Sequence, residues 1–211
     1  MTTRNIGRGF ASAPLLVLTL WSAPAGTSVA AADGCPDAEV VFARGTGEPV
    51  GPGGTGQAFI DALTAQLPGK AINIYPVNYP STTDYVNSAR AGAADAVGHV
   101  QGTAANCPKT KIVLGGYSQG AAVMDLTSHQ LPPQAANRVA AVALFGNPES
   151  SYSKQLSDSQ IPAIDPSYSP KTIDICLPED IYCTEGGNIL PHLQYVPGST
   201  DQAATFVAQK L

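Results

Sequence analysis

The sequence predicts a single three-layer α/β/α domain, in which a central, mostly parallel five-stranded sheet lies between two layers of helices. Three observations favour this fold. Short apolar runs alternate with longer amphipathic or alanine-rich segments, as in strands joined by crossover helices. The apolar runs are rich in valine and isoleucine, which is typical of strands buried on both faces. One run leads through a glycine-flanked serine into a second helical segment, the strand–turn–helix order of a parallel sheet.

The first half of the domain supplies two strands and two helices. Residues 39–43 (EVVFA) predict the first strand, and a glycine-rich loop follows at 44–56. Residues 57–66 carry apolar side chains at helical spacing and predict the first helix. The second strand is expected at 71–77 (AINIYPV), and the alanine-rich segment 84–106 predicts a long helix.

The second half repeats the pattern. The central strand is expected at 112–114 and a helix at 121–130, which Pro132 and Pro133 end because proline cannot continue a helix. The fourth strand, a weaker fifth strand and the last helix are expected at 139–145, 172–176 and 200–211. In such a sheet the site lies at the carboxyl ends of the strands.

Residues 1–32 are predicted to be a secretory signal peptide. Arg4 and Arg8 give a basic start, an apolar stretch follows, and Ser28-Val29-Ala30 or Ala30-Ala31-Ala32 offers a cleavage site. A membrane anchor is the alternative, but the apolar stretch is short for a bilayer and prolines interrupt it. The domain is therefore expected at 33–211, and the protein outside the cell, in solution or associated with the cell wall.

The charge balance argues against nucleic acid as a partner. The chain has 11 basic and 16 acidic residues, a formal net charge of −5, and loss of residues 1–32 makes it −7. An acidic protein is repelled by phosphate backbones and by anionic lipid. The remaining length, roughly 180 residues, suits one domain with one core, and we expect a monomer.

Four cysteines in an exported chain predict two disulfides. Zinc is the competing interpretation, but no C-x₂-C or H-x₃-H spacing occurs. Four cysteines permit three pairings, and the expected strand order 2-1-3-4-5 separates them. Cys35 and Cys107 precede neighbouring strands, whereas Cys176 and Cys183 lie at the opposite edge of the sheet. The sequence therefore predicts the pairs Cys35–Cys107 and Cys176–Cys183.

The segment Gly116-Tyr117-Ser118-Gln119-Gly120 matches G-x-S-x-G, the nucleophile elbow. This turn raises the serine hydroxyl above the sheet edge and directs the next amide, that of Gln119, toward a developing oxyanion. A glycine-rich turn that only packs a helix on the sheet is the alternative. The motif predicts that Ser118 is a nucleophile.

A serine nucleophile needs a base, and the chain has three histidines. His129 is expected about 16 Å from Ser118 along the same helix, which is too far. His99 falls inside a long helix, where an exposed or capping role is expected. His192 is expected in a loop at the carboxyl edge, within reach of the elbow, and is the predicted base.

The acid that orients the base should lie between the serine and the histidine in the chain. Asp180 is the predicted acid because the Cys176–Cys183 loop would hold it rigidly. Asp174 lies within the fifth strand, where it would face a sheet surface, and Glu179 is the main rival. The full set of candidates is Asp158, Asp165, Asp174, Glu179, Asp180 and Glu185.

At these residues the chain resembles the cutinase family of serine esterases, particularly its secreted mycobacterial and actinobacterial members. The matching motifs are Ala43-Arg44-Gly45-Thr46, Gly116-Tyr117-Ser118-Gln119-Gly120, Cys176-x₃-Asp180-x₂-Cys183 and Pro191-His192-Leu193. The resemblance implies a lidless α/β hydrolase with the triad Ser118, His192 and Asp180 and no metal or organic cofactor. It also implies an oxyanion hole from the amides of Thr46 and Gln119. A substrate clamp and a structural brace of the loop are the alternatives for Arg44, and the brace is favoured.

The predicted partner is a small or lipid-like ester, with short to medium acyl chains, and polyester, triglyceride and phospholipid also fit. A thioesterase, a cell-wall acyltransferase and a secreted binding protein with a silent triad remain as alternatives. Ile189, Leu190 and Leu193 flank the predicted base. Either they form an apolar rim that accepts acyl chains or touches a lipid surface or the cell envelope, or they pack inward.

Overall fold

The computed structural model describes residues 1–3 and 34–211, and the folded unit described below is residues 34–211. Apart from its first three residues, the predicted signal peptide lies outside the described residues. The described part of the chain contains no helix that combines the length and the apolar character needed to cross a membrane.

A five-stranded, wholly parallel sheet forms the middle layer of this unit, in the order β2-β1-β3-β4-β5 that the sequence predicts. The strands are β1 (Ala38–Ala43), β2 (Ile72–Pro76), β3 (Lys111–Tyr117), β4 (Val139–Phe145) and β5 (Thr172–Ile175). Since all five run the same way, their carboxyl ends meet at one edge, and the loops that follow them gather there.

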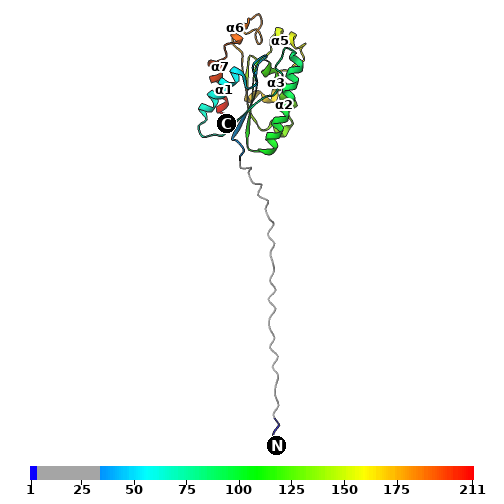
Figure 1. The fold of residues 1–211 in the computed structure, drawn as a ribbon, viewed down its shortest axis with the longest axis vertical. Helices are drawn as coiled ribbons and strands as arrows, with labels where there is room; N and C mark the ends of the chain where they lie inside the picture. The colour runs from blue at the N-terminus through cyan, green and yellow to red at the C-terminus, as the bar shows by residue number, and fades with distance from the viewer. Residues whose placement is uncertain (4–33) are drawn as a thin grey trace. The chain divides into compact units, whose positions relative to one another are not determined.

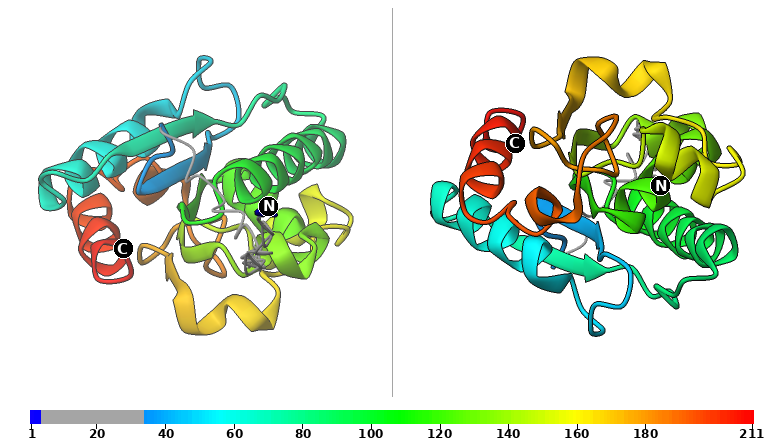
Figure 2. Two further views of the ribbon diagram at one scale, coloured as in Figure 1. Left: turned by 90° about the horizontal axis from the view of Figure 1, so that it is seen from below. Right: turned by 90° about the horizontal axis from the view of Figure 1, so that it is seen from above.

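Helices cover both faces of the sheet (Figures 1 and 2). One face is covered by α1 (Gly53–Gln66) and α7 (Gly198–Ala208), and the other by α2 (Tyr85–Asn106) and α3 (Gln119–Gln130). Short helical segments complete the domain: α4 (Pro133–Ala136), α5 (Ser151–Leu156), the 3₁₀ segment η1 (Pro166–Lys171) and α6 (Ile189–His192). The predicted three-layer arrangement is confirmed.

The core is divided by the sheet into two apolar clusters. Alternate residues of β3 show the division, since Ile112 and Leu114 pack toward α2 and α3, whereas Val113 packs toward α1 and α7. The α1/α7 side is aromatic, with the rings of Phe42, Phe59 and Phe145 in mutual contact. The side chains of both clusters are buried and closely packed against the sheet. The sheet is therefore a rigid support for the loops at its edge.

Several element boundaries differ from those predicted. Helix α1 begins at Gly53 rather than at residue 57, because packing of its apolar face on the sheet outweighs the low helix propensity of glycine. Helix α7 covers Gly198–Ala208 rather than residues 200–211. The expectation that His192 lies in a loop was wrong, since it is the last residue of the four-residue helix α6. Asn188 caps that helix by accepting a hydrogen bond from the Leu190 amide.

Both predicted disulfides are present. Cys35 is bonded to Cys107 across a sequence separation of 72 residues, at the amino edge of the sheet. Cys176 is bonded to Cys183 across seven residues, just after β5 and therefore at the carboxyl edge. The first joins the start of the domain to the end of α2, and the second closes a small loop.

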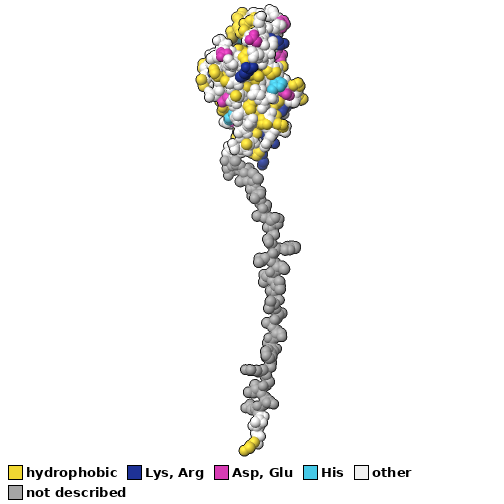
Figure 3. All heavy atoms as spheres, turned by 90° about the vertical axis from the view of Figure 1, so that its right-hand side faces the viewer, with side chains coloured by type: hydrophobic (Ala, Val, Ile, Leu, Met, Phe, Trp, Pro, Cys, Tyr) yellow, Lys and Arg dark blue, Asp and Glu magenta, His cyan; other side chains and the backbone are white. Residues whose placement is uncertain are grey.

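Charged side chains are scattered over the face shown in Figure 3, and yellow apolar side chains are visible at its upper end. This end carries α5 and α6 in the view of Figure 1.

Candidate active site

Ser118 is the single residue between the end of β3 and the start of α3. Its backbone lies at φ 57° and ψ −120°, a conformation that non-glycine residues rarely adopt, and its amide donates to the Phe145 carbonyl. The glycines of the motif permit this turn. A Cβ atom on Gly116 would overlap the Gly120 carbonyl, and one on Gly120 would overlap the Ala43 carbonyl. The elbow geometry therefore depends on both glycines as well as on the serine.

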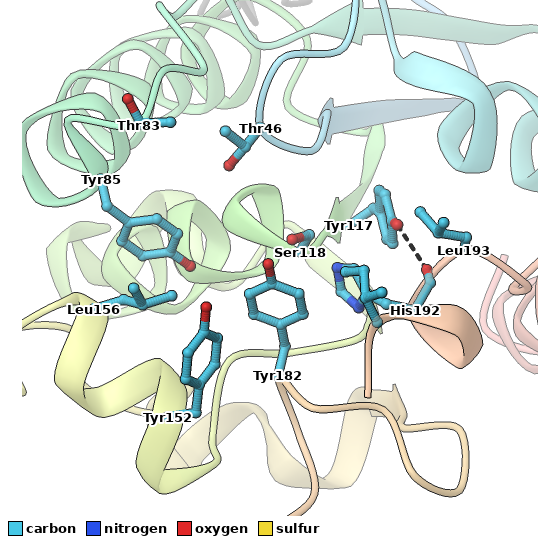
Figure 4. A pocket seen from close by; sticks show the side chains of 11 residues that line it. Thr46, Thr83, Tyr85, Tyr117, Ser118, Tyr152, Leu156, Tyr182, His192 and Leu193 are labelled. Carbon is cyan, nitrogen blue, oxygen red and sulfur yellow. Dashed lines mark hydrogen bonds between the residues drawn. The ribbon is translucent and has the colours of Figure 1, made fainter. Parts of the chain in front are cut away.

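His192 and Asp180 form a buried pair. The Nδ1 atom of His192 lies 2.7 Å from Oδ2 of Asp180, and the two side chains are 5% and 0% exposed. The Nε2 atom of His192 is buried and has no hydrogen-bond partner among the described residues. In Figure 4 the imidazole faces the cavity in which the Ser118 side chain lies. The ring therefore has one nitrogen held by a carboxylate and the other available to a proton donor.

Two tyrosines flank the imidazole. The Tyr117 ring stacks at 5.0 Å between centroids, and the Tyr182 ring lies at 4.3 Å. The Tyr117 hydroxyl also donates to the backbone carbonyl of His192, at 2.7 Å (Figure 4). Burial raises the pKa of Tyr117, so its hydroxyl stays protonated and remains a donor. These contacts restrict the ring to one orientation.

The Asp180 carboxylate is held in its charged form. Burial alone would raise its pKa, but hydrogen bonds from His192, from the Tyr195 hydroxyl and from the Tyr182 amide outweigh burial, and the pKa lies below its ordinary value. The loop between Cys176 and Cys183 is also fixed by its own backbone, since the Asp180 amide donates to the Leu177 carbonyl and the Cys183 amide donates to the Asp180 carbonyl, both at 3.1 Å. The acid therefore occupies a fixed position beside the imidazole.

The two amides expected to form an oxyanion hole belong to Gln119 and Thr46. Gln119 is the first residue of α3, and an amide at that position has no acceptor within the helix. Its side chain is fully buried and tied to the loop before α2, with Nε2 donating to the Thr82 carbonyl at 2.9 Å. Thr46 and Ser118 line the same cavity (Figure 4).

Arg44 braces the loop that carries Thr46, as the sequence predicts. It is 4% exposed, and its guanidinium donates to the backbone carbonyls of Glu48 and Tyr79. Glu48 in turn accepts from the Gly45 amide at 2.6 Å. All of these contacts lie within the loop or between it and the segment before α2, so the arginine fixes backbone rather than facing the cavity.

The cavity has a volume of about 370 Å³ and a partly apolar wall. Ile189 and Leu193 line it and are 44% and 69% exposed, while Leu190 is 64% exposed. Of the two possibilities for these side chains, the structure favours the rim, since none of them is packed inward. The cavity is lined by Thr46, Thr83, Tyr85, Tyr117, Ser118, Tyr152, Leu156, Tyr182, Ile189, His192 and Leu193 (Figure 4).

The other two histidines have structural contacts elsewhere. His99 on α2 lies 3.0 Å from the Glu39 carboxylate and stacks on Tyr75. The Nε2 atom of His129, near the end of α3, lies 2.8 Å from the Ala163 carbonyl, and Nδ1 lies 3.5 Å from Asp165. Neither histidine lines the cavity that contains Ser118.

The rival acids also have other partners. Asp174 accepts from the Asn147 side chain at 3.0 Å, and Glu185 accepts from Ser151 at the start of α5. Asp165 accepts from Ser167 at the start of η1. In the part of the chain that the structure describes, neither Asp158 nor Glu179 forms a hydrogen bond or an ion pair with His192. Among the described residues, Asp180 is therefore the carboxylate that pairs with the imidazole.

Sequence reasoning missed four residues around this pair: Tyr117, Tyr182, Tyr195 and Gly146. The tyrosines carry no local pattern that separates them from ordinary core aromatics. Gly146 did carry a signal, because a glycine directly after a predicted strand often marks a turn with positive φ. In the structure its φ is +57°, and its Cα lies against the His192–Asp180 pair.

Replacing Gly146 by alanine is expected to lower kcat by about 100-fold, because the imidazole must move. The new Cβ would lie 2.7 Å from Cε1 of His192 and 3.1 Å from Oδ2 of Asp180. The positive φ adds strain of about 1–3 kcal/mol. Hydrolysis of p-nitrophenyl butyrate, the reaction that the predicted triad implies, measures the first effect, and thermal unfolding measures the second. Gly98→Ala on α2 is the control, since the new Cβ would have no atom within 4 Å. Unchanged kinetics in Gly146→Ala would contradict the prediction.

Among residues 1–3 and 34–211, no three His, Cys, Asp or Glu side chains are grouped so that they could hold a metal ion.

Comparisons with known proteins agree over the whole folded unit. The family profile described as Cutinase matches residues 34–211. Carboxylesterase Culp1 of Mycobacterium tuberculosis is 52% identical over 213 residues, which cover 100% of this chain and 98% of that relative. Phospholipase Culp4 of the same organism is 44% identical over 219 residues, which cover 99% of this chain and 91% of that relative.

A solved structure of similar fold is that of Trichoderma reesei cutinase in complex with a C11Y4 phosphonate inhibitor. It has a TM-score of 0.68 and 32% sequence identity, over 83% of this chain and 76% of that chain. The sequence and structure comparisons therefore point to the same group of proteins.

Proposed function

Because the chain belongs to the cutinase family and is a carboxylic-ester hydrolase, we propose that Ser118, His192 and Asp180 are its catalytic triad. The observation that carries this proposal is the His192–Asp180 hydrogen bond of 2.7 Å, with the free Nε2 atom facing the cavity of Ser118. The absence of a hydrogen bond between Nε2 of His192 and the Ser118 hydroxyl among the described residues is compatible with this role. In enzymes without bound substrate, the hydrogen bond between base and nucleophile is often long.

The mechanism proceeds through an acyl-enzyme. His192 takes the proton of Ser118 at Nε2 as Oγ attacks the ester carbonyl, and Asp180 stabilises the imidazolium through Nδ1. The amides of Gln119 and Thr46 bind the oxyanion, each contributing roughly 3 kcal/mol. His192 then donates the proton to the departing alcohol, and a water molecule hydrolyses the acyl-enzyme by the reverse sequence.

The substrates we propose are esters of short to medium acyl chains, with polyester and lipid esters as further candidates. The partly apolar cavity and the exposed side chains of Ile189, Leu190 and Leu193 support acyl chains as ligands. The same exposed side chains support transient contact with a lipid surface or the cell envelope. One relative carries the name phospholipase, which adds phospholipid to the candidates.

We also propose that the protein is exported and acts as a monomer. The two disulfides support an oxidising compartment, where such bonds persist. The signal-peptide pattern of residues 1–32 also supports export.

A fluorophosphonate probe tests the proposal directly. We expect a single adduct per chain, which peptide mapping by mass spectrometry locates on Ser118. A protein that binds ligands without catalysis would stay unlabelled. A series of p-nitrophenyl esters from acetate to palmitate, with matched thioesters and a phospholipid, then separates esterase from thioesterase and phospholipase activity. Transfer to an added alcohol rather than to water would identify an acyltransferase.

A further inference from the structure

The Tyr195 side chain contacts the predicted acid but is not part of the cavity wall. Its hydroxyl donates to Oδ2 of Asp180 at 2.7 Å, the same oxygen atom that Nδ1 of His192 contacts at 2.7 Å. Tyr195 is 1% exposed and does not line the cavity. We propose that Tyr195 is a positioning residue that fixes the Asp180 carboxylate and limits how strongly it stabilises protonated His192. This inference rests on the proposed function.

The hydrogen bonds of Asp180 leave its carboxylate no freedom to rotate. Oδ1 accepts from the Tyr182 amide at 2.9 Å, and Oδ2 accepts from both Tyr195 and His192. A buried carboxylate is strongly destabilised unless such donors compensate for lost water. Donors on both oxygens also define the plane of the group and hence the direction in which the imidazole is held.

The Tyr195 ring is itself fixed, so its hydroxyl points in one direction. The ring makes edge contacts with Phe145 at 6.2 Å, with Tyr117 at 5.8 Å and with His192 at 6.1 Å between centroids. The hydroxyl also accepts a hydrogen bond from the Leu177 amide at 3.2 Å, just after β5. The phenol therefore links the end of β5 to the acid.

Four titratable side chains interact with the charge of the Asp180 carboxylate: His192, Tyr117, Tyr182 and Tyr195. Burial is the main cause that raises the pKa of each tyrosine, so all three remain neutral over the working pH range. A neutral donor such as Tyr195 withdraws part of the carboxylate charge from the imidazole. Without it, the carboxylate is more basic and stabilises the imidazolium more strongly.

The Tyr195→Phe variant removes this one hydroxyl and keeps the ring. We expect kcat for p-nitrophenyl butyrate to fall about 10-fold with little change in KM, because the lost interaction positions the base rather than the substrate. The acid limb of the pH profile of kcat/KM should move to higher pH, by a few tenths to about one unit. A side chain that only fills the core would not move this limb.

Tyr168→Phe is the matched control. Tyr168 is also 2% exposed, but its hydroxyl has no hydrogen-bond partner among the described residues, and it packs in the cluster on the α2/α3 side of the sheet. Its replacement should leave kcat and the acid limb unchanged. If Tyr195→Phe behaves like Tyr168→Phe, the inference is overturned.

A double-mutant cycle tests whether Tyr195 acts through Asp180. In an Asp180→Asn background, Tyr195→Phe should change kcat less than twofold, since no carboxylate remains to be positioned. The same 10-fold loss in both backgrounds would overturn the inference.

If Tyr195→Phe does not fold, site-specific 3-fluorotyrosine at position 195 replaces it. This stronger donor should move the acid limb to lower pH, and an unmoved limb would also overturn the inference.

The outcome is separable from that of the proposed function. Full activity in Ser118→Ala would remove the proposed triad and the role of Tyr195 with it. An inactive Ser118→Ala variant together with a Tyr195→Phe variant that matches Tyr168→Phe would leave the triad in place and overturn the role of Tyr195 alone.

Discussion

Replacing Ser118 by alanine should lower kcat for p-nitrophenyl butyrate by about 10⁴- to 10⁶-fold, because the variant lacks the proposed nucleophile. The residual rate would come from the oxyanion-hole amides and the cavity acting on water. The fold should persist, since alanine has the same backbone restrictions as serine at φ 57°, and the elbow is held by backbone contacts and by the two glycines.

The measurement combines steady-state kinetics with thermal unfolding of the same samples. Ser159→Ala is a matched control, because Ser159 also has a positive φ, of 56°, and does not line the cavity. It should retain full activity. Turnover by Ser118→Ala within tenfold of the parent protein would contradict the assignment of Ser118 as nucleophile, and it would leave the cavity as a binding site.

Removing the Cys35–Cys107 disulfide should lower the free energy of unfolding by about 4 kcal/mol, because the bond closes a long loop in the unfolded chain. The sequence separation is 72 residues, and the loop includes β1, α1, β2 and α2. The bond lies at the amino edge of the sheet, so kcat of the folded fraction should not change. Urea unfolding of the Cys35→Ala/Cys107→Ala variant measures the first effect, and ester hydrolysis below the transition measures the second.

For the Cys176→Ala/Cys183→Ala variant we expect the opposite combination, a smaller loss of stability together with a loss of activity. Its loop spans seven residues, so the expected loss of stability is smaller, about 2 kcal/mol. However, Asp180 lies inside this loop, and its release should reduce kcat about 10-fold through misplacement of His192. Equal kinetic effects from the two variants would show that the short loop has no special part in holding the acid.

The architecture was predictable because each strand has its own apolar run, and a helical segment separates each strand from the next among the first four strands. The run at β4 is long and uninterrupted, and this strand covers 139–145 as expected. Strand β3 is longer than the expected 112–114, because Gly115, Gly116 and Tyr117 continue the pairing with its neighbours. Parallel order follows from these crossovers, and the placement of Cys35 and Cys107 follows from the order. These inferences need only local patterns and one topological rule.

The short helices were not predictable in the same way. Helix α5 contains Ser151 and Tyr152, and α6 is only four residues long, so neither has the repeated apolar spacing from which a helix is inferred. Each begins at a capping side chain, Ser150 or Asn188, and α5 is also held by hydrogen bonds from the Ser150 and Ser153 hydroxyls to the carbonyls of residues 181 and 182. Such contacts are set by tertiary structure, which local sequence does not encode.

For the site, order along the chain identified Ser118, Asp180 and His192 as candidates, but it gave no information on what supports them. Tyr117 and Tyr195 reach the imidazole and the carboxylate only because β3, the loop after β5 and the segment after α6 converge at one edge. Gly146 is required by close approach of two side chains from a distant segment. Convergence of this kind becomes visible only when the chain is folded.

The backbone of Ser118 has a consequence for how this chain evolves. A serine at φ 57° and ψ −120° stores roughly 1–3 kcal/mol that a glycine at the same place would release. Selection for thermodynamic stability alone would therefore drive position 118 toward glycine, and only selection for turnover keeps a hydroxyl there. A descendant lineage that no longer needs the reaction should lose this serine early and gain stability as it does so.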